Sequence, residues 1–428
     1  MLAHPGMRAF GSSAEPWWKR AVFYQIPDSA AIDYKVVATK LDAMQSIGVD
    51  ALIVPAPPLP IQSAASVNDA IAAQASLDEF DNFTRQSTSR GIHVLLLLSA
   101  ARADAELAGR TRFWLTRGVS GFRIVTPPET DLQDRAAIVQ AVRVLTGSVA
   151  GERIVLADSL AVADNSLRPA IEHSATSRRA TAGRNTVAAP LLQLDTHIGQ
   201  LSSPSAAALR PLLAQSLTQP NLLLDTRPQA PEPDIARLLA AIALTTNSAA
   251  LIDPAVELVL PDSAPRAPEP EQGTDKPAPA PIPAQPPPGV YLPYKPYVPP
   301  PRPHAAAPAP LPPPPDPLAA WYGQLAALHH GNTALRTGSK VFLDFDAQNA
   351  LVWVARPATP TPQNPPVIVL CNLSSSPVQL SLADTVKKLN LHGFFLRTLA
   401  RSDSGMGAQD LNAVSLPPFS VFIGELRR

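Results

Sequence analysis

Three aspartates and one arginine occupy positions from which they could take part in chemistry. Asp158, Asp195 and Asp225 each end a short apolar run, and Arg123 lies near the end of a fourth run. Two carboxyl groups about 5–9 Å apart can act as nucleophile, acid or base on a glycosidic bond. An arginine beside them could bind an anionic or sugar ligand. A structural interpretation stands beside this one, because strand-end carboxylates cap helices and Arg123 could simply pair with Asp158 or Asp225.

The elements that would position these side chains follow a repeated pattern. Short apolar runs end in small, polar or acidic residues, and helix-like stretches separate several of them. Parallel strands buried on both faces have this continuous apolar character. The runs are Val22–Pro27, Ala51–Ala56, His93–Ser99, Gly121–Thr126, Arg153–Asp158, Leu191–Thr196, Asn221–Thr226 and Ser248–Asp253. They predict a (β/α)8 TIM barrel with its site at the carboxyl ends of the strands. A doubly wound sheet also fits the pattern.

The prolines divide the chain. Pro261–Pro317 contain 24 of the 50 prolines, and proline fixes φ and donates no backbone hydrogen bond. Residues 259–317 are therefore predicted to form an extended, proline-rich linker. The aromatic residues within Tyr291–Pro299 leave a second interpretation open, in which this segment docks a protein partner or packs on the chain's own surface.

The remaining chain falls into three predicted parts, which are a flexible N-terminus over residues 1–16, a barrel over 17–258 and a C-terminal domain over 318–428. Alternating apolar segments in the last part predict a small antiparallel β-sandwich. A helix over Leu318–His329 introduces it, and Asp316 is placed to cap the free amides of that helix. His329 and His330 end the helix, where an imidazolium suits the helix dipole. Adjacent histidines make a poor metal site.

The composition excludes several classes of function. The chain carries 35 basic and 35 acidic residues, and a zero net charge without basic runs argues against nucleic-acid binding. Its single cysteine, Cys371, excludes both an intrachain disulfide and a cysteine zinc cluster. The apolar runs fall short of the about 20 residues of a membrane span, and residues 1–16 lack the order of a signal peptide. We therefore expect a cytoplasmic protein without a cofactor, a bound metal or a membrane partner.

A set of motifs occurs in a fixed order along most of the chain. The segments are Trp17–Ile26 (WWKRAVFYQI), Gly48–Leu52, Arg90–Val94, Phe113–Arg123 (FWLTRGVSGFR), Val367–Asn372 and Leu416–Val421. Together they resemble the α-amylase superfamily, glycoside hydrolase family 13, particularly its α-glucosidase and trehalose-synthase members. The resemblance implies a barrel followed by a C-terminal β-domain and a relation to α-glucoside metabolism. Trp17 and Trp18 are expected to pack in the core and the barrel floor rather than to form a platform for a sugar ring.

The resemblance shows which catalytic groups are missing. The family's nucleophile is the aspartate two residues after the GFR motif, and Val125 stands there in this chain. Valine has no lone pair and cannot form a glycosyl-enzyme intermediate. The family's acid corresponds to Asp158 and its third carboxylate to Asp225. Only about 20 residues lie between Ser99 and Gly121, room for one short helix, so the family's domain B is predicted to be absent.

Three functions remain open at this point. The leading hypothesis is a catalytically inactive pseudoenzyme that serves as a scaffold or partner-binding module, through the proline-rich segment or the barrel surface. The second is a degenerate but active α-glycosidase or transglycosylase that uses Asp158 and Asp225, or Asp195 in place of one of them. The third is a non-catalytic protein that binds α-glucan weakly.

Overall fold

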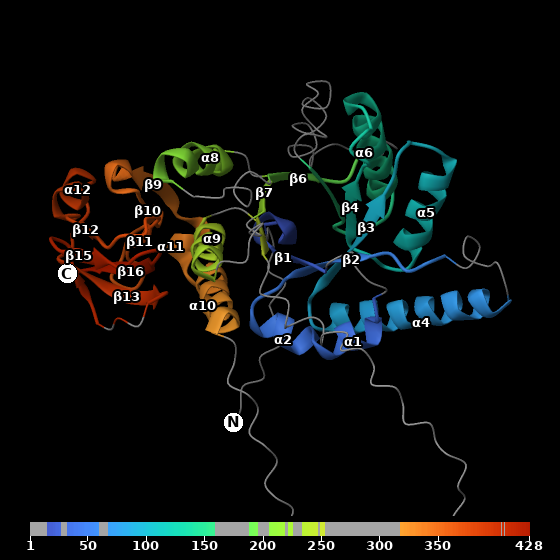
Figure 1. Ribbon diagram of the computed structural model, residues 1–428, viewed down its shortest axis with the longest axis horizontal. Coiled ribbons are helices and arrows are strands. Elements are labelled where there is room, and N and C mark those ends of the chain that lie inside the picture. Colours follow the sequence, from blue (N-terminus) through green and yellow to red (C-terminus); the bar gives the residue numbers. More distant parts are fainter. Residues whose placement is uncertain are drawn as a thin grey trace, which may run out of the picture. The chain divides into compact units, whose positions relative to one another are not determined.

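The computed structural model describes residues 15–26, 32–59, 67–158, 188–195, 205–218, 221–225, 233–246, 249–252, 317–403, 405 and 407–428. The first part alternates strands and helices, and the last part is mostly strands (Figure 1). The elements of the first part are η1 (Trp17–Arg20), β1 (Val22–Gln25), α1 (Tyr34–Thr39), α2 (Leu41–Ser46), β2 (Ala51–Pro55), α4 (Val67–Ser89), β3 (His93–Ser99), α5 (Ala105–Thr116), β4 (Gly121–Val125), α6 (Leu132–Gly147), β5 (Ile154–Asp158), β6 (Leu191–Asp195), α8 (Ala206–Thr218), β7 (Leu222–Asp225), α9 (Pro233–Thr245) and β8 (Ala249–Ile252). Those of the last part are α10 (Pro317–Gly331), α11 (Thr333–Thr337), β9 (Ser339–Leu343), η4 (Asp346–Gln348), β10 (Ala350–Arg356), β11 (Val367–Asn372), β12 (Val378–Leu380), α12 (Ala383–Lys388), β13 (Phe395–Arg401), β14 (Gln409–Asp410), β15 (Val414–Leu416) and β16 (Val421–Arg427).

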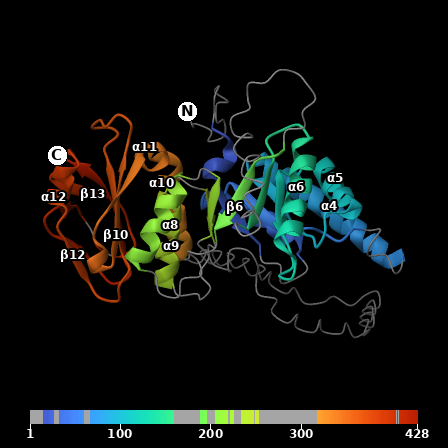
Figure 2. The same ribbon diagram turned by 90° about the horizontal axis from the view of Figure 1, so that it is seen from above.

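Strands β1 to β8 form a closed parallel barrel in chain order. The barrel closes where β8 pairs with β1, with Leu251 opposite Phe23. Figure 2 shows α4, α5 and α6 on the outer side of the neighbouring strands, where α4 packs on β3 and α6 on β5. The TIM barrel is therefore confirmed, and the doubly wound sheet is wrong.

The strands are apolar throughout because both of their faces are buried. Alternate residues fill the lumen, and those between them pack against the helices. The lumen cluster includes Phe23, Ile53, Leu95, Leu156, Leu194, Leu223 and Leu251. Trp18 joins this cluster and Trp17 packs beside it, so the expected role of both tryptophans in barrel packing is confirmed.

The connection between β3 and α5 is short. It consists of residues 100–104, which lead from Ser99 directly into a helix that Asp104 caps by accepting a hydrogen bond from Leu107 N. Five residues are too few to form a folded domain between the two elements. The predicted absence of domain B is therefore confirmed.

The last part of the chain forms an antiparallel sandwich. One sheet has the strand order β14-β13-β16-β11-β10-β9, and β12 and β15 form the other. Strand β11 (VIVLCN) is apolar at every position but its last because it is buried on both faces. Ile368 and Leu370 pack in the sandwich core, whereas Val369 and Cys371 belong to the cluster that α10 and the barrel share.

Side chains from α8 and α10 join the barrel to the sandwich. Asn349, in the left-handed region at φ 50°, accepts a hydrogen bond from Ala206 N at 2.9 Å and so caps α8. Arg210 of α8 forms ion pairs with Asp344 and Asp346. Trp321 of α10 donates to Arg237 O of α9 at 3.1 Å.

Several sequence predictions lie outside the described residues. These include residues 1–14 of the N-terminus and residues 253–316, which hold Asp316 and nearly all of the predicted linker. The predicted helix over Leu318–His329 is α10, which begins at Pro317, a residue suited to a first helical turn. Across the described residues, no helix is both long enough and apolar enough to cross a membrane.

Candidate functional site

The candidate site lies where β4, β5 and β7 end at the carboxyl face of the barrel. Phe122 and Ile124 of β4 pack among the helices, so the alternation places Gly121, Arg123 and Val125 on the lumen side. Strand β4 therefore places a buried guanidinium in a lumen that is otherwise lined mostly by apolar side chains.

Arg123 and Asp158 are brought together. Arg123 keeps only 7% of its surface exposed, and its Nη2 donates to Oδ1 of Asp158 at 3.2 Å. The Asp158 side chain is 46% exposed and ends β5 at the rim. The pairing of Arg123 with Asp158 that the sequence allowed is therefore confirmed.

The position of the missing nucleophile lies on an aliphatic part of the rim. Val125 ends β4 and pairs in register with Ser99 of β3, and Arg123 pairs with Leu97. Neither β3 (HVLLLLS) nor β4 (GFRIV) contains a carboxylate. No side chain of these two strands can therefore attack an anomeric carbon as a carboxylate would.

The other two aspartates end the next strands along the barrel. Asp225 ends β7 with 6% of its surface exposed and pairs in register with Leu251. Asp195 ends β6 opposite Leu224, and its side chain lies outside what the structure describes. Strand β6 separates Asp158 from Asp225, and β6 itself ends in Asp195, one position beyond Leu194, the register partner of Asp158.

A metal centre is not present in the part of the chain that the structure describes. No three histidine, cysteine or carboxylate side chains there are grouped so that they could hold an ion. The lone Cys371 is fully buried in β11, and burial raises the pKa of its thiol well above the usual range.

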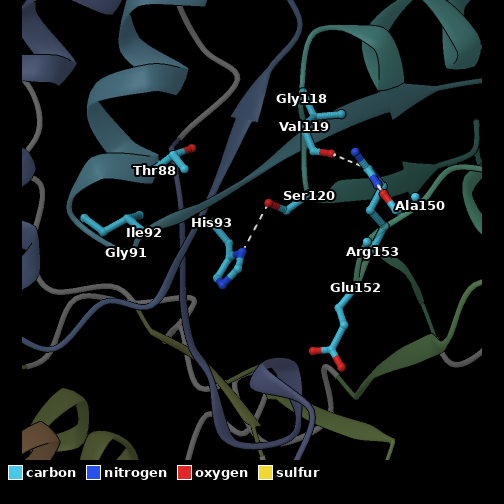
Figure 3. A pocket seen from close by; sticks show the side chains of 11 residues that line it. Thr88, Gly91, Ile92, His93, Gly118, Val119, Ser120, Ala150, Glu152 and Arg153 are labelled. Atoms are coloured by element: carbon cyan, nitrogen blue, oxygen red, sulfur yellow. Dashed lines mark hydrogen bonds between the residues drawn. The ribbon is translucent and has the colours of Figure 1, made fainter. Parts of the chain in front are cut away.

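A cavity of about 250 Å³ lies at the opposite end of the barrel, where β3, β4 and β5 begin (Figure 3). His93 turns toward Ser120 across it, with Nδ1 3.2 Å from the hydroxyl oxygen. The Trp17 ring stacks on the His93 ring with centroids 3.7 Å apart. The sequence analysis did not single out His93, because nothing about a histidine at the start of an apolar run indicates that Trp17 stacks on it.

The buried His93 ring is expected to lower the free energy of unfolding in acid. Burial lowers the pKa of His93 from 6.5 to about 4, although Glu152 nearby opposes the shift. The unfolded chain takes up this proton at the ordinary pKa, so the stability is complete above pH 6.5 and is lost as the pH falls toward 4. We expect His93→Gln to reduce the loss of unfolding free energy between pH 7 and pH 4 by about 2 kcal/mol, allowing for partial exposure. Urea titrations at several pH values measure this, and parallel curves for the two proteins would contradict it.

Comparison with solved structures identifies proteins that share this fold. Trehalulose synthase MutB from Pseudomonas mesoacidophila MX-45 is 13% identical, with a TM-score of 0.58, over 97% of this chain and 100% of that one. Isomaltulose synthase from Klebsiella sp. LX3 is 13% identical, with a TM-score of 0.56, over 96% of this chain and 99% of that one. Trehalose-6-phosphate hydrolase from Bacillus licheniformis is 12% identical, with a TM-score of 0.58, over 97% of this chain and 100% of that one.

These three proteins are members of glycoside hydrolase family 13, so the resemblance noted in the sequence motifs is confirmed for the fold. At such low identity the likeness establishes the fold alone. No protein-family model matches the sequence, and no curated protein matches it either.

Proposed function

We propose that this chain is a catalytically inactive relative of the α-glucoside-converting enzymes that share its fold, and that it acts as a scaffold or partner-binding module. The observation that carries the proposal is Val125 at the end of β4. A retaining mechanism forms a covalent bond between a carboxylate and the sugar, and valine offers no atom that could form it.

The state of Asp158 supports the same proposal. A glycosidase needs a proton donor that stays protonated until the leaving oxygen arrives. Oδ1 of Asp158 accepts a hydrogen bond from the Arg123 guanidinium at 3.2 Å, so this carboxyl group already has a partner within the protein. The carboxylate best placed to replace the missing acid is therefore engaged as a partner of Arg123.

The direct connection from β3 to α5 supports it further. A glycosidase excludes water from its sugar pocket and holds the substrate close to the reacting groups. In this chain, residues 100–104 link β3 to a surface helix and contribute no folded wall beside Ser99. A bound glucoside would have less protein around it on this side of the barrel.

The test is an assay for turnover with matched carboxylate variants. We expect no hydrolysis or isomerisation of sucrose, trehalose, maltose or 4-nitrophenyl α-glucoside above the level of the double variant Asp158→Asn/Asp225→Asn. An intact α-glucosidase measured beside it shows that the conditions support turnover. Any trace that survives in the double variant comes from a contaminating enzyme. Turnover that the wild type shows and Asp158→Asn abolishes would instead establish the active alternative.

Calorimetric titration with maltooligosaccharides separates the scaffold from a glucan binder. We expect no saturable heat at millimolar ligand, because the described rim of β3 and β4 presents Leu97, Ser99 and Val125 rather than aromatic rings. Saturable binding that Asp225→Asn weakens would replace the scaffold with the glucan-binding alternative.

A further inference from the structure

Three successive strands of the barrel are preceded by the same short pattern. The segments Gly48–Asp50, Gly91–His93 and Gly118–Ser120 each consist of a glycine with a positive φ, a buried β-branched residue and a polar residue. The polar residue of each segment lies where its strand begins. The pattern therefore brings one acid, one imidazole and one hydroxyl to the end of the barrel opposite the carboxyl rim.

The acid serves the fold, whereas the imidazole and the hydroxyl meet in a cavity. Oδ2 of Asp50 accepts a hydrogen bond from Val22 N at 2.9 Å and so ties the start of β2 to β1. His93 Nδ1 lies 3.2 Å from Ser120 Oγ, and both residues line the cavity of about 250 Å³ where β3, β4 and β5 begin (Figure 3). A hydroxyl within hydrogen-bond reach of an imidazole is the arrangement of a nucleophile and its activating base.

Backbone pairing holds both side chains in place. His93 N donates to Asp50 O at 2.8 Å. Ser120 N donates to Val94 O at 2.7 Å, and Ser120 O accepts from Ile154 N at 3.1 Å. The two groups therefore belong to paired strand ends rather than to loose loops, which fixes their geometry before a ligand arrives.

Two further residues position the His93 ring and favour its charged form. The Trp17 ring stacks on it with centroids 3.7 Å apart, and Trp17 Nε1 donates to Glu152 O at 3.1 Å. Burial lowers the pKa of His93 to about 4, and the Glu152 carboxylate opposes this shift. The ring is therefore neutral at pH 7, so Nδ1 can accept a proton when the ring's own proton is on Nε2. Glu152 then stabilises the imidazolium that proton transfer creates.

A second buried histidine shows what a purely structural ring looks like. His329 of α10 has its Nε2 2.8 Å from Arg20 O of η1 and its Nδ1 2.9 Å from Leu244 O of α9. Both nitrogens face backbone carbonyl oxygens, which have no proton to give. His93 differs because its Nδ1 faces a hydroxyl group at a cavity.

The cavity offers both space and hydrogen-bond donors. A Cβ added to Gly91 or to Gly118 would meet nothing within 4 Å, so the wall beside the pair is open. Arg153 lines the same cavity, and its guanidinium donates to Val119 O and Ala150 O. Within the described residues, further N–H groups of this guanidinium remain for a ligand. Such donors stabilise the oxyanion that forms when a hydroxyl attacks a carbonyl group.

We propose that Ser120 and His93 form an acyl-transfer site that hydrolyses small activated esters, namely those with a phenol or a thiol as leaving group. Ser120 Oγ bonds to the carbonyl carbon while His93 Nδ1 takes the hydroxyl proton. The bond from that carbon to the leaving oxygen or sulfur breaks, and the leaving group receives the proton from His93. Water then attacks the acyl group on Ser120 in the same way, which restores the hydroxyl and releases a carboxylic acid.

The cavity and the base together define the class of substrate. A volume of about 250 Å³ lies below the about 300–1,000 Å³ of pockets for drug-sized ligands, so the acyl group must be short. A weakly basic imidazole is effective only when the carbonyl is reactive and the leaving group departs easily, and aryl and thiol esters meet both conditions. The inference is independent of the proposed function, because the site lies at the opposite end of the barrel and uses no carboxylate of the rim.

Hydrolysis of 4-nitrophenyl acetate by the full chain tests the proposal. We expect saturable release of 4-nitrophenolate near neutral pH, and Ser120→Ala and His93→Gln should each lower kcat/KM by about 100-fold or more, the lower end of what general-base catalysis contributes. Equal rates in the wild type and Ser120→Ala would overturn the proposal, because other side chains would then account for the reaction. Absence of turnover in the wild type overturns it as well.

Two controls separate this site from the rest of the chain. Ser148→Ala removes an exposed serine whose Oγ donates to Leu145 O, and it should keep the wild-type rate. The double variant Asp158→Asn/Asp225→Asn removes rim carboxylates and should also keep it. A large loss in either variant contradicts the assignment to Ser120 and His93.

Covalent labelling identifies the attacking group independently of turnover. A fluorophosphonate reacts with activated serine hydroxyls, so it should add to Ser120 in the wild type, as peptide mass spectrometry locates it. It should not add in a His93→Gln protein whose circular dichroism shows that it is folded. The proposal fails if Ser120 is not labelled in the wild type, or if labelling persists unchanged in folded His93→Gln. If His93→Gln does not fold, labelling of the wild type and the rate of Ser120→Ala, which loses a single oxygen atom, decide the matter.

Discussion

Gly121→Ala is expected to lower the free energy of unfolding by about 3–5 kcal/mol, a large part of the stability of a typical domain. Gly121 opens β4 at φ +156°, and a Cβ there would lie 2.0 Å from the carbonyl oxygen of Ile154. Gly121 and Ile154 are register partners in the barrel, so the clash can be relieved only by separating β4 from β5. Urea denaturation followed by circular dichroism measures the loss.

Gly118→Ala is the matched control for this prediction. Gly118 also has a positive φ, +85°, but a Cβ there would meet nothing within 4 Å. The control therefore carries only the backbone strain, about 1 kcal/mol. Equal losses in the two variants would show that the contact with Ile154 has no energetic weight.

Asn372→Ala is expected to lower the free energy of unfolding by about 3–4 kcal/mol. The Asn372 side chain is fully buried at the end of β11. Its Nδ2 donates to the carbonyl oxygens of Ser376, Leu416 and Pro417 at 2.8, 3.2 and 2.8 Å. Its Oδ1 accepts from the amide and the hydroxyl of Ser374. Alanine would remove all of these hydrogen bonds at once, although Ser376 O and Pro417 O would keep those from the hydroxyls of Ser374 and Ser420. Thermal unfolding measures the cost.

Two further variants sharpen this prediction. Asn372→Asp keeps the shape but turns the donor into an acceptor that faces three carbonyl oxygens, so it should be more destabilising than alanine. Asn412→Ala removes an exposed asparagine whose side chain donates only to Asp410, and it should change stability by less than about 0.5 kcal/mol. A mild Asn372→Ala together with a mild Asn372→Asp would show that water replaces these hydrogen bonds.

The barrel strands could be predicted from the sequence because burial on both faces gives each strand a short, continuous run of apolar residues. A run such as His93–Ser99 has no polar face, and turn residues bound it on both sides. The same property hides which residues face the lumen. Leu95 and Leu96 look alike in sequence, yet Leu95 packs in the lumen and Leu96 packs among the helices. That distinction depends on strand register, which the whole barrel sets.

The candidate site could be predicted only in part, for a related reason. The end of β5 located Asp158, and comparison of motifs located Val125, but the sequence left two partners open for Arg123. The contact between His329 Nε2 of α10 and Arg20 O of η1, at 2.8 Å, could not be predicted, because the two residues are 309 positions apart in the chain. Contacts of this kind arise from closure of the barrel, and no local pattern of apolar and polar residues encodes them.

The long separation between His329 and Arg20 has a consequence for synthesis on the ribosome. At about 5–20 residues per second, roughly 15–60 s pass between translation of residue 20 and of residue 329, 309 positions later. During this interval β1 and β8 are already synthesised, but the end of α10, where His329 contacts the segments that precede both strands, is not. The segments that α10 later contacts are therefore exposed on the nascent chain at this stage, and a chaperone or a protease can reach them.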